Sequence, residues 1–391
     1  MNSSRAFAPI RPLHLANGGF IALASAMGNG RFVYTPILPE MAAALHLSAS
    51  QAGLIASANF AGYLLGALVA TASQFARRRR FWMLAALTVS ALTTGAMAAF
   101  STIVPFLLLR FASGFASAFV LVFASTLVLD RLGVAGRGQL SALYFAGVGS
   151  GIAASAVIVA ALVRYRIGWE GQWIVVAVAS LMAVVATAVL IPPTGPALAQ
   201  NGTVPVRKLG TPLVALAAAY GLFGFGYVIT ATFLVQLVRN SPEIAPVEPV
   251  IWVIVGLTAI PSVAFWTALA KRIGIGAAYA IASLVQALGV LASVLWIAPA
   301  GAILASVLLG GTFMGLTALG LVGGRKLAAG NAARVVAIMT VVFGIGQIAG
   351  PVFGGWLHDL TGSFLLPSVA AAGGLLLAAI LVWRFSAEAL R

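Results

Sequence analysis

Residues 28–38 read GNGRFVYTPIL and residues 224–234 read GFGYVITATFL, so similar segments occur twice at an offset of 196 residues. A second pair has almost the same offset, since Gly147-Val148-Gly149-Ser150 corresponds to Gly344-Ile345-Gly346-Gln347, 197 residues later. Both offsets are close to half of the 391 residues. The shared offset, more than either short match, indicates that the chain contains a duplicated unit.

Each copy lies within a long apolar stretch. The chain is 62% hydrophobic and 7% charged, whereas a soluble domain carries roughly 25% charged residues. A helix needs about 20 apolar residues to cross a bilayer. Twelve stretches meet this length, at 13–38, 49–74, 81–100, 103–129, 139–163, 171–192, 211–238, 249–270, 275–297, 300–324, 335–357 and 363–385. The sequence predicts an all-α integral membrane protein with twelve transmembrane helices.

A polar segment divides these stretches into two sets of six. Residues 193–211 contain three prolines and three glycines and form the longest polar interruption. We therefore predict an N-terminal six-helix bundle over residues 1–192, a cytoplasmic linker over 193–211 and a C-terminal six-helix bundle over 212–391.

The positive charges are distributed unevenly between the connections. The even-numbered connections and both ends hold most Lys and Arg, including the run Arg77 to Arg80, whereas the odd-numbered connections hold Arg164, Arg166 and Arg239. By the positive-inside rule both termini are cytoplasmic. This distribution also explains the net charge of +15 without a nucleic-acid partner. We expect a multi-pass protein of the cell membrane, in bacteria the inner membrane.

Several functional classes have no support. The chain has no Cys, and its three His residues share no metal-ligand spacing. The glycine-rich segments follow no strand, which argues against nucleotide binding. No nucleophile, base and orienting group fall at a recognisable spacing. We therefore predict neither an enzyme nor a bound metal or cofactor.

Short motifs carry a family resemblance. Residues 73–80 read SQFARRRR, residues 271–274 read KRIG, and Arg110 is followed by Gly114. In these motifs the chain resembles the major facilitator superfamily over its whole length, and residues 28–39 (GNGRFVYTPILP) are similar to its bacterial YbfB/YjiJ-like group. Neither loop keeps the acidic residue with which the family builds a charge latch.

The resemblance implies a monomeric secondary transporter that works by alternating access. It also implies that the first and seventh spans line a central cavity, and that Arg77, Arg78 and Arg272 act in coupling or gating. The Arg77 to Arg80 run has a simpler alternative role, which is to fix topology. The fifth span lacks the family's antiporter Gly-Pro pair, which disfavours proton-antiporting drug efflux.

Two arginines lie within predicted spans. Arg31 and Arg110 have no deep Asp or Glu to pair with, and Glu40 is the nearest acidic residue and a possible coupling group. A buried cation is costly and marks a functional position. A guanidinium matches a carboxylate or phosphate, so we expect a small anionic substrate. The alternatives are that Arg31 extends to external water and that Arg110 bonds a neighbouring backbone.

Other polar side chains complete the predicted substrate site. Gly28, Gly30 and Pro36 weaken the first helix. The predicted contacts besides the arginines are Asn29, Tyr34, Tyr144, Tyr220, Tyr227 and Gln347. Packing between helices is the alternative role for each of them.

Three functions follow from these residues. The first is a secondary transporter of a small organic anion, which interacts with its substrate and the lipid bilayer. The second is an efflux transporter of amphipathic drugs or metabolites, which the aromatic residues would serve. The third is a membrane receptor that binds without translocation, and the absence of a predicted soluble output domain argues against it.

Overall fold

The computed structural model describes residues 11–193, 210–328 and 332–391, and almost all of these are helical. The longer helices are α1 (Pro12–Leu23), a π-helix (Ala24–Phe32), α2 (Tyr34–Leu45), α3 (Ala49–Val69), α4 (Arg79–Ala96), α5 (Ile103–Val134), α6 (Ser141–Arg164), α7 (Trp169–Leu190), α8 (Thr211–Arg239), α9 (Glu248–Ile273), α10 (Ile275–Leu295), α11 (Pro299–Lys326), α12 (Ala332–Thr361) and α13 (Leu365–Phe385). Short 3-10 helices occupy Ser73–Arg78, Met97–Ala99, Gly138–Leu140, Ala245–Val247 and Glu388–Leu390.

Eleven helices in the described residues, α3 to α13, are long and apolar enough to cross a membrane. The first predicted span, 13–38, is instead built from α1, the π-helix and α2. Val33 donates its N–H to the carbonyl of Gly28, five residues back, and Pro36 has no N–H to donate. The prediction of a helical, multi-pass membrane chain is confirmed, with a first span that is broken.

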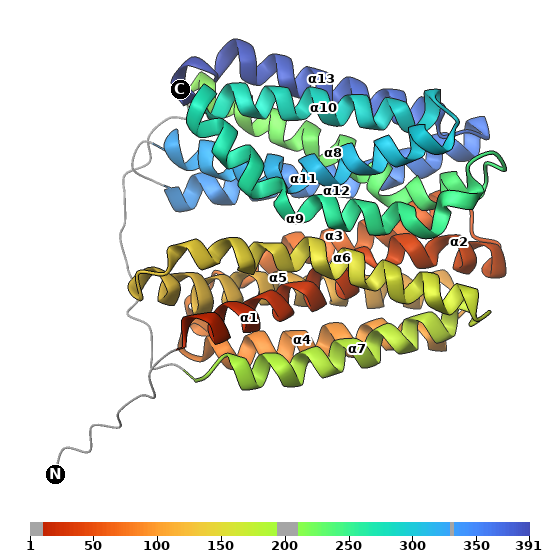
Figure 1. Cartoon of the computed structure of the whole chain (residues 1–391), viewed down its shortest axis with the longest axis horizontal. Helices are drawn as coiled ribbons and strands as arrows, with labels where there is room; N and C mark the ends of the chain where they lie inside the picture. The colour runs from red at the N-terminus through yellow and green to blue at the C-terminus, as the bar shows by residue number, and fades with distance from the viewer. Residues whose placement is uncertain (1–10, 194–209, 329–331) are drawn as a thin grey trace.

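The helices form two groups that lie side by side (Figure 1). We call α1 to α7 the N-terminal group and α8 to α13 the C-terminal group. The start of α1, drawn in red, and the C-terminal end of the chain lie at the same end of the helices (Figure 1). We call this end the terminal face and the other end the opposite face. Most of the predicted linker, residues 194–209, lies outside the described residues, as do Arg5, Arg207 and Lys208.

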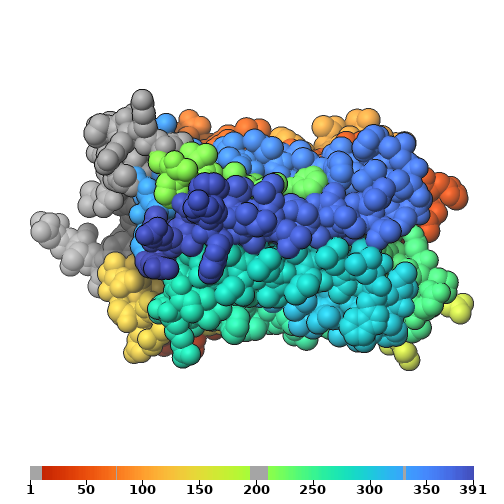
Figure 2. Space-filling model, turned by 90° about the horizontal axis from the view of Figure 1, so that it is seen from above, coloured from red at the N-terminus to blue at the C-terminus, as the bar shows by residue number. Residues whose placement is uncertain are grey.

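The outer surface of the C-terminal group is apolar. Figure 2 shows this side covered largely by α10 in teal and by α12 and α13 in blue. Leu288 of α10 and Ile380 and Trp383 of α13 are each more than half exposed. Such side chains suit contact with lipid, whereas the polar side chains of the same helices, such as Gln286 and Ser368, are buried.

The two groups approach to backbone contact at two helix pairs. A Cβ atom on Gly53 of α3 would lie 2.1 Å from the carbonyl oxygen of Pro351 of α12. A Cβ atom on Gly256 of α9 would lie 2.3 Å from the backbone nitrogen of Ala153 of α6. Glycine is therefore required for these close approaches, and the two pairs define the surface between the groups.

Polar contacts between the groups close the opposite face. The Asp359 carboxylate of α12 accepts hydrogen bonds from the backbone N–H groups of Ala49 (3.0 Å) and Ser50 (2.9 Å) at the start of α3. A helix N-terminus carries a partial positive charge, so an anion there is stabilised. Deeper in the interface, Ser57 donates to the carbonyl of Ile348 at 2.8 Å.

Candidate functional site

Arg31 lies in the last turn of the π-helix and faces the C-terminal group. Its side chain is buried, and its guanidinium carbon lies 4.1 Å from the ring centroid of Tyr63 and 4.7 Å from that of Phe60. Its Nη2 donates a 3.0 Å hydrogen bond to Oε1 of Gln347, while its Nε has no partner among the described residues. Rings and an amide favour the cation but leave its charge unneutralised.

Gln347 joins the two groups at this point. Its oxygen accepts from Arg31 of the N-terminal group, and its Nε2 donates to the hydroxyl of Tyr227 on α8. Gln347 is 1% exposed, so this chain of contacts is shielded from solvent. The amide oxygen occupies the place at which a carboxylate oxygen would bind the guanidinium.

Arg110 has a different environment. Its Nη1 donates to the carbonyl of Gly30 at 3.0 Å and its Nη2 to that of Arg31 at 2.8 Å. Ser113 donates to the same Gly30 carbonyl at 2.8 Å, and Asn59 donates to the carbonyl of Arg110 at 3.0 Å. Arg110 therefore satisfies the carbonyls that the irregular first span leaves free, and it holds Arg31 in place.

Within the part of the chain that the structure describes, no ion pair neutralises either arginine. Among the described residues the ion pairs are Arg239 with Glu248 and His358 with Asp359. The first lies in the connection between α8 and α9, and the second lies at the end of α12. Two positive charges therefore remain close together inside the molecule.

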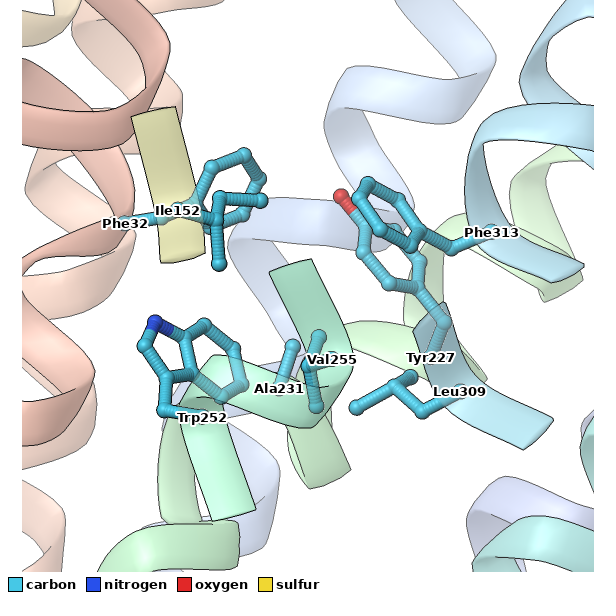
Figure 3. Close-up of a pocket in the computed structure, with 8 residues that line it drawn as sticks. All are labelled: Phe32, Ile152, Tyr227, Ala231, Trp252, Val255, Leu309 and Phe313. Atoms are coloured by element: carbon cyan, nitrogen blue, oxygen red, sulfur yellow. The ribbon is translucent and has the colours of Figure 1, made fainter. Parts of the chain in front are cut away.

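Two small cavities lie between the groups, and both arginines line one of them. The first, here the arginine cavity, has a volume of about 10 Å³ and is lined by Arg31, Phe32, Tyr34, Thr35, Ala56, Phe60, Arg110, Ala231 and Thr232. The second, here the aromatic cavity, has the same volume and is lined by Phe32, Ile152, Tyr227, Ala231, Trp252, Val255, Leu309 and Phe313 (Figure 3). About 10 Å³ holds at most one water molecule, so a substrate enters only when the groups separate.

The structure brings some predicted contacts to these cavities and places others elsewhere. Arg31, Tyr34 and Arg110 line the arginine cavity, and Tyr227 lines the aromatic cavity. The hydroxyl of Tyr34 donates to the carbonyl of Ala52 at 2.9 Å. Gln347 lines neither cavity but binds Arg31 and Tyr227 directly.

Three predicted contacts face their own group. Asn29 donates to Ser180 of α7 at 3.0 Å, and the Tyr144 hydroxyl lies 2.9 Å from that of Ser125. Tyr220 donates to the carbonyl of Thr317 at 3.3 Å and stacks on Phe343, with centroids 4.6 Å apart. These contacts match the packing role that the sequence left open for them.

The predicted coupling or gating residues lie away from both cavities. Glu40 of α2 accepts a hydrogen bond from Gln172 of α7. Arg77 and Arg78 are exposed in the 3-10 helix after α3, and Arg272 is exposed in the last turn of α9. Their roles stay predictions.

Sequence reasoning missed the aromatic lining of the second cavity. Phe32, Phe313 and Trp252 come from three different helices, and each is an ordinary apolar residue of a membrane span. Trp252 lies four residues from the start of α9, a position typical of the aromatic belt at a membrane interface. Only the tertiary arrangement shows that its ring is buried between the groups.

The sequence profile of a family described as an uncharacterised MFS-type transporter, YbfB, matches residues 23–383. The chain belongs to the major facilitator superfamily. The resemblance to its YbfB-like group is thereby confirmed, and the chain is an MFS-type secondary transporter and a multi-pass membrane protein. A search of curated proteins finds no significant match.

Solved structures of other transporters share this fold. The nucleoside transporter NupG has a TM-score of 0.73 at 17% identity, covering 96% of this chain and 99% of that one. A D-xylose–proton symporter has a TM-score of 0.72 at 13% identity and 97% and 98% coverage. A bacterial homologue of the human lysosomal transporter Spinster, inward-facing and occupied, has a TM-score of 0.71 at 16% identity and 99% coverage of both chains.

Proposed function

We propose that the protein transports a small organic anion by alternating access, and that Arg31 binds its carboxylate. The observation that carries the proposal is the hydrogen bond from the buried Arg31 guanidinium to a neutral amide, Gln347, across the surface between the groups. An anion that replaces the amide would form two charge-assisted hydrogen bonds with the fork of the guanidinium. Binding would then connect both groups through Arg31 and Tyr227.

The proposal assigns Arg110 a positioning role. Its two hydrogen bonds to the carbonyls of Gly30 and Arg31 hold the π-helix, and with it the Arg31 side chain, against α5. Its positive charge adds to the potential in the arginine cavity, to which it contributes lining atoms. The carboxylate would therefore meet a field of two cations and no anion.

The proposed architecture is twelve spans in two six-helix bundles, the first bundle including the broken first span. With both termini in the cytoplasm, the contacts of Asp359, Ser57 and Thr35 lie toward the outer side. Rocking of one bundle against the other would break these contacts and open the cavities outward. We propose that the protein works as a monomer in a bacterial inner membrane.

Coupling is proposed to involve no buried carboxylate. Glu40 is engaged by Gln172 within the N-terminal group, so a proton that accompanies transport would travel on the substrate or through Glu40 near the outer face. Arg77, Arg78 and Arg272 would act at the cytoplasmic ends of the helices, where they fix topology and contact anionic lipid. Exchange or uniport requires none of these groups.

Efflux of an amphipathic compound is the second candidate function. The observation that favours it is the aromatic cavity, whose lining includes the rings of Phe32, Tyr227, Trp252 and Phe313. The two candidates differ in the charge of the substrate, because the field of Arg31 and Arg110 repels a cation.

The test is thermal stabilisation of the detergent-purified protein by carboxylates, phosphates and cationic drugs. A ligand at 100 times its dissociation constant stabilises by about 2.7 kcal/mol. We expect carboxylates to stabilise the native protein strongly and the Arg31→Lys variant only weakly. The Arg31→Ala variant should show no stabilisation by carboxylates. The matched control is Arg239→Ala, which removes an arginine paired with Glu248 outside the site and keeps the shift. Stabilisation by cationic drugs alone would favour the second candidate.

A further inference from the structure

We infer that the transported anion is an aromatic carboxylate with a hydrogen-bond acceptor at the end remote from the carboxylate, and that the indole N–H of Trp252 binds this acceptor. The inference rests on the proposed function, since it takes Arg31 as the carboxylate site. It adds the chemistry of the rest of the molecule and a residue that determines specificity.

The two cavities are adjacent parts of one space. Phe32 and Ala231 line both of them, so the ring of Phe32 separates the charged part from the aromatic part. Phe32 directly follows Arg31 in the chain, and the Arg31 guanidinium carbon lies 5.5 Å from its ring centroid. A ligand that places its carboxylate on Arg31 therefore extends past Phe32 into the aromatic cavity when the groups separate.

Two rings at one wall of the aromatic cavity, those of Tyr227 and Phe313, are nearly parallel, whereas the ring of Phe32 lies at 67° to that of Phe313. The ring of Tyr227 lies 5.9 Å from that of Phe313 with an angle of 8° between the planes, and 6.0 Å from that of Phe343 with an angle of 3°. Figure 3 shows the rings of Tyr227 and Phe313 side by side at one wall of the cavity. Parallel rings favour a planar aromatic ligand by stacking over a bulky aliphatic one.

Trp252 supplies a polar group at the far wall. Its side chain is 2% exposed, and its Nε1 has no hydrogen-bond partner among the described residues. Figure 3 shows this nitrogen on the side of the indole that faces Ile152 and Phe32. A buried donor without a partner carries a desolvation penalty, which an acceptor on the ligand would relieve.

The position of Trp252 distinguishes it from a second tryptophan with the same property. The Nε1 of Trp173 on α7 is also buried without a partner among the described residues, but Trp173 lines neither cavity. Its indole packs near Arg110 inside the N-terminal group, with the guanidinium carbon 5.9 Å from the ring centroid. Trp173 therefore serves as a matched control for the loss of an unpaired indole N–H.

The experiment compares three carboxylates of equal charge by titrating their thermal stabilisation of the purified full-length protein. These are cyclohexanecarboxylate, benzoate and 4-acetylbenzoate. Benzoate differs from the first by its aromatic ring, and 4-acetylbenzoate differs from benzoate by a carbonyl acceptor remote from the carboxylate. We expect the dissociation constants to fall in that order, with 4-acetylbenzoate at least about fivefold tighter than benzoate, as one hydrogen bond to a buried donor allows. Equal affinities in the native protein would overturn the inference, whatever the variants do.

The variants assign the effect to a residue. In Trp252→Phe, which keeps a ring, the ratio of the benzoate and 4-acetylbenzoate dissociation constants is expected to fall to about one, whereas Trp173→Phe keeps the native ratio. An unchanged ratio in Trp252→Phe would refute the role of Trp252. If none of the three carboxylates stabilises the native protein while other carboxylates do so through Arg31, or if all three bind equally and Arg31→Ala abolishes binding, only the present inference fails. If no carboxylate of any kind stabilises the native protein, the proposed function fails as well.

Discussion

At the scale of single residues, the two buried arginines have unlike partners. Arg110 is bonded to the backbone carbonyls of Gly30 and Arg31, whereas Arg31 is bonded to the side chain of Gln347. A carbonyl of a fixed helix is a permanent partner. An amide side chain on the opposing group is a partner that moves away when the groups separate, which suits Arg31 to a binding role.

This difference leads to a prediction for Gln347→Glu. The substitution sets a carboxylate beside a cation whose desolvation is already part of the native state, so we expect about 1–3 kcal/mol of stabilisation in a thermal unfolding assay. Added carboxylates should then give no further shift, because the site holds an internal anion.

Gln286 supplies the control for this prediction. It is buried in α10 and both of its side-chain polar atoms lack partners among the described residues, so Gln286→Glu buries an uncompensated charge and should destabilise the protein. If Gln347→Glu lowered the stability of the protein as much as Gln286→Glu does, Arg31 would not be a group that binds anions.

The sequence pointed to the polar residues of the cavities more readily than to the apolar and aromatic residues that line them. Arg31, Tyr34, Arg110 and Tyr227 stood out because a polar group is rare in a membrane span, and they line the cavities. Their part in substrate binding stays a prediction. Trp252 does not stand out, since its pairing with the rings across the cavity depends on how α9 packs against the N-terminal group.

At the scale of helices, the first span is the irregular element around which the site forms. Its π-helix releases the carbonyl of Gly30, which accepts from both Arg110 and Ser113. A Cβ atom on Gly28 would lie 2.3 Å from the carbonyl carbon of Gly151, so the segment also needs glycine to pack on α6. The sequence predicted weakened helix geometry here, but not a π-helix, because the hydrogen-bond register depends on neighbouring helices.

The contact of α12 with the start of α3 gives a prediction at the same scale. Asp359→Ala removes the carboxylate from the N-terminus of α3 and should weaken closure of the opposite face by about 1 kcal/mol, a roughly fivefold shift toward outward opening. The chain has no Cys, so Ala56→Cys in the arginine cavity can report the opening. Its labelling by an impermeant maleimide in right-side-out vesicles should become about fivefold faster.

The control is Asp130→Ala, which removes an exposed carboxylate of α5 near the terminal face. It should leave the labelling rate of Ala56→Cys unchanged. If Ala56→Cys were labelled at the same rate with and without Asp359→Ala, the contact of Asp359 with the start of α3 would have no role in closing the opposite face.

At the scale of the whole molecule, two groups of helices meet along a surface of glycine contacts and few hydrogen bonds. Gly53 with Pro351 and Gly256 with Ala153 provide close contact, while Arg31 and Gln347 lie buried between the groups. Hydropathy predicted the helices because lipid imposes length and composition on each one. It could not predict the closed state of the cavities, which depends on the relative positions of the groups.

The proposed topology predicts the accessibility of two exposed serines. Ser73 follows α3 at the terminal face, and Ser101 precedes α5 at the opposite face. In intact cells an impermeant maleimide should label Ser101→Cys, and Ser73→Cys only after permeabilisation, because the positive-inside rule places the terminal face in the cytoplasm. The reverse pattern would contradict this orientation.

The most direct test of the central claim is flux in proteoliposomes loaded with 4-acetylbenzoate or benzoate, measured as exchange with external radiolabelled benzoate. The account predicts exchange by the native protein, loss of at least about 100-fold in Arg31→Ala, the equivalent of about 2.7 kcal/mol, and native exchange by Arg239→Ala. Carboxylate binding without exchange would indicate a receptor. Native exchange by Arg31→Ala would contradict the account, because the buried guanidinium would then have no part in binding the transported anion.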